Sequence, residues 1–175
     1  GSVGRLNDDH KRFSDIIRAL PYIKESQPSA RLLIVGDGPD RKLLEDLACK
    51  INVHDSVIFT GYQENSRDFY ELMDVFVLAS AHEAFGLVLV EAMLSKVPVV
   101  ASNVGGIPFV LDHGHSGSLV PPFSPKKIAD AVLKLLCNRE IAEEYRVNGF
   151  IRAHSEFSAD RYVSDVARLY ADIFI

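Results

Sequence analysis

Short apolar runs alternate with longer amphipathic segments along most of this chain. The short runs are continuous and rich in β-branched residues, as in strands that are buried on both faces of a sheet. They predict strands over residues 31–35, 56–60, 74–78 and 97–101, and a further strand that starts at Val3. The amphipathic segments predict helices over residues 13–25, 40–51, 65–73, 87–95 and 125–137, and two C-terminal helices over 139–154 and 159–173. This alternation predicts an α/β fold with a Rossmann-like, doubly wound parallel sheet.

Three local signals add detail to the helices. One apolar stripe has the spacing of a single buried helix face and consists of Leu43, Leu44, Leu47, Ala48 and Ile51. Ser158 is suited to cap the last helix. Residues 87–90, Leu-Val-Leu-Val, favour a strand by propensity alone. A second strand so soon after residues 74–78 would leave no crossover for a parallel sheet, so we predict a helix there.

Ligands of an open parallel sheet bind outside the carboxyl ends of its strands. In this chain those ends are followed by loops over residues 4–12, 36–39, 60–63, 79–87 and 102–106. The same loops contain most of the glycines. We therefore expect the ligand site in these loops.

Length and composition indicate one ordinary globular domain of 175 residues. A net charge of −5 argues against binding nucleic acid or an anionic membrane through bulk charge, so any phosphate must be held by a local cluster. The two cysteines, Cys49 and Cys137, form no CxxC pair, and no apolar run approaches the roughly 20 residues of a membrane span. We expect a reduced, cytoplasmic location. We interpret Gly1-Ser2 as residues left from cloning and residues 3–175 as the native domain, without an N-terminal part.

Two glutamates, Glu83 and Glu91, stand in the most informative segment, Ser80 to Leu94. The stretch around Glu91 is otherwise apolar, which predicts a helix that is buried on every side. An ionised carboxylate is costly there without a partner, and a ribose diol would be a suitable one. The alternative, that Glu91 reaches solvent or pairs with a nearby cation, stays open.

Two features could hold a diphosphate. Gly86 opens the predicted helix, so the amides of Gly86, Leu87 and Val88 would point into the strand-end cleft, and such amides suit phosphate. A basic cluster follows the first strand and consists of Arg5, His10, Lys11 and Arg12. A solvated loop is the usual explanation of such a cluster.

Two other motifs lack the residues that their chemistry requires. Val35-Gly-Asp-Gly-Pro39 is not a GxGxxG dinucleotide turn, because Arg41 stands in place of the third glycine. We interpret it as a tight strand–helix turn with Pro39 at the first helical position. Asp112-His-Gly-His115 has no further metal ligand at a fitting spacing, so we expect a polar loop and no metal site.

Taken together, these segments resemble the C-terminal domain of the GT-B-fold retaining glycosyltransferases of family 4. The matching pieces run nearly from end to end of the chain. They are Val3-Gly-Arg-Leu6 with Lys11, Val35-Gly-Asp-Gly-Pro39, Phe59-Thr-Gly61, Glu83-Ala-Phe-Gly86 through Glu91-Ala-Met93, Pro98-Val-Val-Ala-Ser102 and Gly105-Gly106-Ile-Pro108. Their order and spacing are specific, although each piece alone is weak.

The resemblance implies a role for each matching residue. Arg5 and Lys11 would neutralise the donor diphosphate. Glu83, the first glutamate of the family's E-x7-E motif, would contact the donor sugar, and Glu91, the second, would hold the ribose. Further contacts are implied for the backbone of Phe85 and Gly86 with the sugar, of Leu87 and Val88 with the phosphates, and of Gly61 and Tyr62 with the base.

The chain departs from the family pattern at two places. Lys11 is one residue farther from Arg5 than in the commonest form, and Arg12 replaces the usual glycine, so either Lys11 or Arg12 could be the phosphate ligand. Phe109 stands where many relatives have glutamate, which removes any polar contact from that position.

The resemblance implies a donor domain for a UDP-, GDP- or ADP-sugar, acting in retaining transfer without a metal or other cofactor. The product would be a polysaccharide, lipopolysaccharide or glycoconjugate. An N-terminal domain of the same protein would supply the acceptor, so this fragment alone should bind and not catalyse. The full-length enzyme could sit at the inner membrane surface. The alternatives are a stand-alone nucleotide-binding regulatory module and a related GT-B epimerase or phosphorylase; we see no signature of the pyridoxal phosphate site that a phosphorylase needs.

Overall fold

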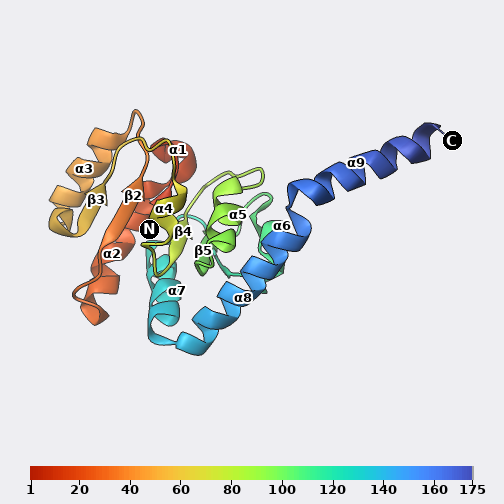
Figure 1. Ribbon diagram of the computed structural model, residues 1–175. Coiled ribbons are helices and arrows are strands. Elements are labelled where there is room, and N and C mark those ends of the chain that lie inside the picture. Colours follow the sequence, from red (N-terminus) through yellow and green to blue (C-terminus); the bar gives the residue numbers. More distant parts are fainter. Residues whose placement is uncertain (175) are drawn as a thin grey trace.

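A computed structural model describes the backbone of residues 1–174 and the side chains as far as residue 171 (Figure 1). The strands are β1 (Ser2–Val3), β2 (Leu32–Val35), β3 (Val57–Phe59), β4 (Phe76–Leu78), β5 (Val99–Ser102) and β6 (Ser118–Val120). The helices are α1 (Asp8–Lys11), α2 (Phe13–Ser26), α3 (Arg41–Lys50), α4 (Arg67–Tyr70), α5 (Leu87–Leu94), α6 (Ile107–Val110), α7 (Pro125–Cys137), α8 (Arg139–Glu156) and α9 (Ala159–Phe174). Two 3₁₀ turns, η1 (His54–Ser56) and η2 (Asp112–Gly114), complete the order.

The strands form two parallel three-stranded sheets, β1-β2-β3 and β4-β5-β6. Two hydrogen bonds join them, from the amino group of Gly1 to the Val75 carbonyl (2.7 Å) and from the Val77 amide to the Gly1 carbonyl (2.8 Å). The six strands therefore follow the order β3-β2-β1-β4-β5-β6, and the direction of winding reverses between β1 and β4. The prediction of a Rossmann-like doubly wound sheet is confirmed.

Alternate residues of the central strands pack on opposite faces of the sheet. Val75, Val77 and Ala79 join the core that the sheet shares with α2, α3 and α7. Phe76 and Leu78 join the second core, beneath α5 and α6. The side chains of a strand alternate between its two faces, and both faces are buried here. These apolar runs therefore have no polar positions.

Most predicted helices are present, and α5 forms where propensity alone favoured a strand. The prediction for residues 65–73 was too long, because α4 covers only Arg67–Tyr70. Its ends are tightened by local bonds: Asn65 Oδ1 accepts from the Arg67 amide at 3.1 Å, and the amide of Met73 donates to the Tyr70 carbonyl at 3.0 Å, a spacing of three residues.

Several other predictions were wrong. The loop expected over residues 4–12 contains α1, and α6 was not predicted, because helices of four residues are too short to show an apolar period. Strand β6 was missed, because a three-residue strand in a stretch with glycine and serine shows little periodicity. In α3, Leu44 and Ala48 are buried but Leu43 is 55% exposed, because it lies on the solvent side of the helix. Pro39 is not the first helical residue, since α3 starts at Arg41 after its N-cap Asp40.

The C-terminal helices lie along and then beyond the body of the domain. Helix α8 packs on α5, where Gly149 leaves room for Met93. Ser158 caps the next helix as predicted, its Oγ accepting from the Arg161 amide at 3.3 Å. Helix α9 then projects away from the sheet (Figure 1). None of the helices in residues 1–174 is both long and apolar enough to cross a membrane.

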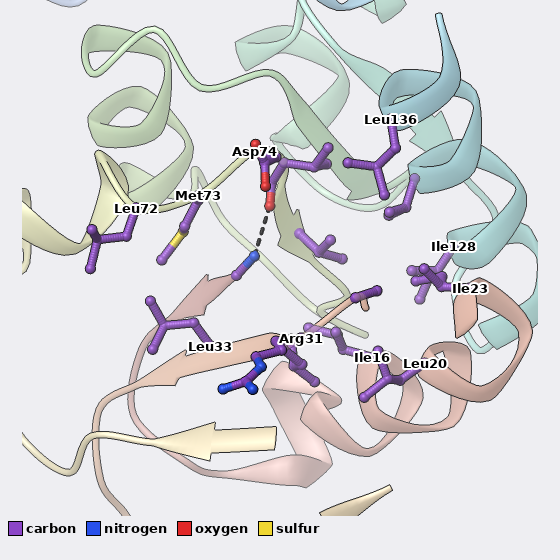
Figure 2. Close-up of a pocket in the computed structure, with 16 residues that line it drawn as sticks. Ile16, Leu20, Ile23, Arg31, Leu33, Leu72, Met73, Asp74, Ile128 and Leu136 are labelled. Carbon is purple, nitrogen blue, oxygen red and sulfur yellow. Dashed lines mark hydrogen bonds between the residues drawn. The ribbon is translucent and has the colours of Figure 1, made fainter. Parts of the chain in front are cut away.

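A small apolar hollow of about 140 Å³ lies at the amino ends of the central strands, away from the predicted ligand loops. Its lining includes Ile16, Leu20 and Ile23 of α2 and Ile128 and Leu136 of α7, with Ile23 and Ile128 side by side (Figure 2). No loop from the carboxyl ends of the strands contributes to its described lining. It is therefore separate from the site considered next.

Candidate functional site

A cleft of about 450 Å³ opens at the carboxyl ends of β1 and β2, beside the reversal point of the sheet. Its lining comes from five loops and helix ends and consists of Val3, Gly4, Arg5, Val35, Gly36, Asp37, Tyr62, Gln63, Ser66, Val88 and Glu91. The position agrees with the rule that predicted it. Four of the predicted site residues are in this lining: Arg5, Tyr62, Val88 and Glu91.

Two further predicted residues, which do not line the cleft, meet at the carboxyl ends of the strands although 72 positions separate them. Lys11, at the end of α1, places its Nζ 2.5 Å from Oε2 of Glu83, in the loop after β4. The side chains are 29% and 13% exposed, so the pair is partly shielded from water and still reachable. Ser80 Oγ donates to the same carboxylate oxygen at 3.4 Å. The fold thus brings a cation and a carboxylate together at the strand ends.

Arg12 points to different partners. Its Nε and Nη2 donate to the two carboxylate oxygens of Asp15 at 3.0 and 3.1 Å, and its guanidinium lies 5.1 Å from the ring centre of Phe123. The hydrogen bond to Asp15 is the main cause that raises the pKa of Arg12, and partial burial acts against it. Arg12 also has φ +53°, a left-handed conformation that explains why glycine is usual there. The geometry favours Lys11 as the ligand-facing cation.

Methionine at each position separates these two roles. Lys11→Met should weaken nucleoside diphosphate binding, because it removes a cation at the strand ends. Stability should change little, because Ser80 still donates to Glu83, whose carboxylate is more exposed than that of Asp15. Arg12→Met should leave affinity unchanged and lower stability by about 2 kcal/mol, since the buried Asp15 carboxylate loses its partner. That loss corresponds to a fall of about 4–8 °C in melting temperature. Calorimetric titration and thermal melting of both variants test this; lost affinity in Arg12→Met alone would reverse the assignment.

Glu91 is exposed, and the prediction that its helix is buried on every side was wrong. Leu89, Val90, Ala92 and Met93 of α5 are buried, but the face with Glu91 is open to the cleft. The Tyr70 hydroxyl donates to Glu91 Oε2 at 2.7 Å and so orients the carboxylate. Burial and this hydrogen bond to a carboxylate both raise the pKa of Tyr70 far above its ordinary value. Tyr70 therefore stays a neutral donor.

The loop between these two glutamates is held by unusually close backbone contacts. The Gly106 amide donates to the Glu83 carbonyl at 3.0 Å. A Cβ added to Gly105 would lie 1.9 Å from the same oxygen, and one added to Gly106 would lie 2.0 Å from the Ala84 carbonyl oxygen. Gly86 is the N-cap of α5 and has φ +87°. Gly105 and Gly106 thus allow the segment before α6 to pack directly against the loop that contains Glu83 and Phe85.

The loop after β3 contributes Gly61 and Tyr62. Gly61 has φ +72° and its carbonyl accepts from the Gly36 amide at 3.0 Å, which ties this loop to the turn after β2. The Tyr62 side chain is 77% exposed at the rim of the cleft. Leu87 is also exposed, at the first turn of α5.

Several site residues were missed from the sequence. Gln63 and Ser66 line the cleft, Tyr70 bonds Glu91 and Ser80 bonds Glu83, but single hydroxyl and amide residues give no distinctive signal in a sequence. Asp112, in the segment for which we expected a polar loop, lies 3.7 Å from Arg152 Nη1. Within the part of the chain that the structure describes, no three His, Cys, Asp or Glu side chains group closely enough to hold a metal ion.

The family model for glycosyl transferases group 1 matches residues 1–152. The chain belongs to this glycosyltransferase family. It is 33% identical over 163 residues to N-acetyl-alpha-D-glucosaminyl L-malate synthase of Bacillus anthracis, covering 93% of this chain and 42% of that protein. The chain thus spans less than half the length of this relative.

Solved glycosyltransferase structures share the fold. The C-terminal domain of a group 1 family glycosyltransferase (LpcC) from Francisella tularensis superposes with a TM-score of 0.80 at 26% identity, over 90% of this chain and 85% of that one. HepE of Anabaena, solved with UDP, has a TM-score of 0.87 at 24% identity, over 98% of this chain and 48% of that one. This glycosyltransferase chain therefore has the fold of the C-terminal, Rossmann-like domain of the GT-B architecture, as predicted.

Proposed function

We propose that this domain binds a nucleoside diphosphate sugar in the cleft beside Arg5, Lys11, Glu83 and Glu91, as the donor for glycosyl transfer with retention. The main support is geometric: Glu83, in the loop before α5, is paired with Lys11, and Glu91, in the second turn of α5, lines the cleft with its carboxylate oriented by Tyr70. UDP is bound in the solved structure of HepE, which has the same fold. The relative from Bacillus anthracis is named N-acetyl-alpha-D-glucosaminyl L-malate synthase.

The proposed binding mode divides the ligand along the cleft. Arg5 and Lys11, with the first amides of α5, would face the diphosphate, because cations and a helix N-terminus favour negative charge. Glu91 would accept hydrogen bonds from the ribose hydroxyls. Glu83 would face the sugar, with the backbone of Phe85 and Gly86. The base would lie against Gly61 and Tyr62.

Chemistry would consist of departure of the nucleoside diphosphate, with negative charge developing on the leaving phosphate. Preorganised cations and amides stabilise such charge without rearranging during the reaction. Arg5 suits this role because it is exposed just after β1 and makes no ion pair with the described side chains of residues 1–171. We propose that the acceptor is supplied by a further domain of the same protein, and that no metal is required.

Nucleoside diphosphate binding should raise the melting temperature in the presence of EDTA. At about 100 times its dissociation constant a ligand stabilises the fold by roughly 2.7 kcal/mol, or about 5–11 °C here. Thermal melting with UDP, GDP and ADP and their sugar esters, with and without EDTA, measures this. No shift with any nucleotide would refute the site, and a shift abolished by EDTA would refute the metal-free mode.

A further inference from the structure

The end of α8 contacts the segment that leads to the proposed sugar site. Arg152, on the last turns of α8, is the final residue of the family match, and Phe157, the C-cap of α8, lies beyond it. Neither residue lines the cleft. Their contacts nevertheless lead to the loop from Glu83 to Gly86.

Arg152 binds the carboxyl end of α6. Its Nε donates to the Val110 carbonyl at 2.8 Å, and its Nη2 donates to the Phe109 carbonyl. The last carbonyls of a helix have no partner within it, so the planar guanidinium is well suited to satisfy two of them. This contact fixes the short helix α6 against α8.

Helix α6 in turn presses on the loop. Its N-cap, Gly106, donates to the Glu83 carbonyl, and Gly105 and Gly106 approach the Glu83 and Ala84 carbonyls too closely for any side chain. In a contact this tight, a shift of α6 has to move the backbone of Glu83 and Ala84.

Phe157 holds the same loop from another side. Its ring meets the ring of Phe85 edge to face, with 5.3 Å between centroids and 88° between planes, and meets the ring of Phe109 at 6.1 Å. The Arg152 guanidinium lies over both Phe109 and Phe157, at 5.4 and 5.5 Å. Phe85 is therefore held by an aromatic and cationic cluster formed at the end of α8.

We propose that Arg152 and Phe157 are positioning residues that fix the Glu83–Gly86 loop and so set the affinity for the sugar part of the donor. The proposal rests on the proposed function, in which this loop faces the sugar. It does not extend to the nucleotide part, whose proposed contacts at Glu91, Gly61 and Tyr62 lie outside the cluster.

The test compares two affinities in each variant of this chain. The ligands are UDP with UDP-glucose, GDP with GDP-mannose and ADP with ADP-glucose; titration calorimetry uses the pair that wild type binds best. Phe157→Ala, and Phe157→Leu with its larger side chain, should weaken the affinity for the sugar nucleotide about 2- to 12-fold, the contribution of one aromatic pair. The affinity for the free diphosphate should change less than about twofold. Phe157→Tyr keeps the ring and should restore the wild-type ratio.

Phe150→Ala is the matched control. Phe150 is also an aromatic residue of α8, but its ring lies against His154 and Lys96 and not against Phe85. It shares a second hollow with Glu91, so an effect there would fall equally on both ligands, which both carry the ribose, and would leave their ratio unchanged. General loosening of α8 would lower both affinities in both variants, whereas the positioning role changes their ratio in the Phe157 variants alone. An unchanged ratio in both Phe157→Ala and Phe157→Leu overturns this proposal and leaves the function intact. If the wild-type chain binds no nucleotide, this proposal and the proposed function are both overturned.

Discussion

Replacing Glu91 by glutamine should weaken a free nucleoside diphosphate and the matching sugar nucleotide by the same factor. Both ligands carry the ribose that Glu91 is proposed to hold, and a hydrogen bond to a charged group contributes about 1.5–3 kcal/mol. The expected loss is therefore about 10- to 150-fold in affinity. In the wild-type chain the Tyr70 hydroxyl donates to Glu91 at 2.7 Å. Stability should change little, because a glutamine oxygen can still accept this hydrogen bond.

Glu83→Gln provides the contrast. It should weaken the sugar nucleotide alone, because its carboxylate is proposed to face the sugar. The free diphosphate should bind no more weakly, since Lys11 loses its 2.5 Å ion pair to Glu83 and keeps its charge. Titration calorimetry of both ligands against both variants gives four affinities, with melting curves to establish folding. Equal losses in Glu83→Gln, or no loss in Glu91→Gln, would disprove this division of roles.

Gly105→Ala should damage both the fold and sugar binding. The new Cβ would lie 1.9 Å from the Glu83 carbonyl oxygen, and φ at this position is +51°. The left-handed conformation costs about 1–2 kcal/mol, and relieving the overlap adds about 1–3 kcal/mol. The relief requires a shift of the Glu83 backbone, so sugar nucleotide affinity should fall at least about tenfold. Melting and calorimetry on the same sample measure both effects.

Gly114→Ala separates the two causes. Gly114 also has a positive φ, +102°, but nothing lies within 4 Å of an added Cβ. This variant should lose only the conformational part of the stability, about 1–2 kcal/mol, and bind both ligands like wild type. Wild-type sugar nucleotide affinity in a folded Gly105→Ala would show that the loop position does not matter for binding.

The sequence predicted the sheet class and most helices because apolar periodicity reports local burial directly. Residues 125–137 were predicted as a helix with the bounds that α7 has. The helical assignment of α5 needed a topological argument, since Leu87-Val-Leu-Val favours a strand, and that argument held. The strand-end rule also located the cleft, because it depends only on the direction of the strands.

Contacts between distant elements could not be predicted in the same way. The pairing of Lys11 with Glu83 depends on how α1 lies against the loop after β4, and periodicity contains no such information. The open face of α5 was missed for the same reason: Glu91 looks buried among apolar neighbours until the packing of its helix on one side only is known. Tyr70, which orients Glu91, could not be found without that packing.

The strand order has a consequence for how the chain folds. β1 is synthesised before the other strands of this domain, yet it lies between β2 and β4, and the bond from the neighbouring Gly1 to Val75 closes a loop of 74 positions. Pairings this distant form slowly, because the chain entropy is lost before the contacts compensate for it. The proposed site straddles the same junction, with Arg5 and Lys11 on the early side and Glu83 and Glu91 on the late side. A nucleotide bound there would tie the two halves together, so donor binding and completion of the fold reinforce each other.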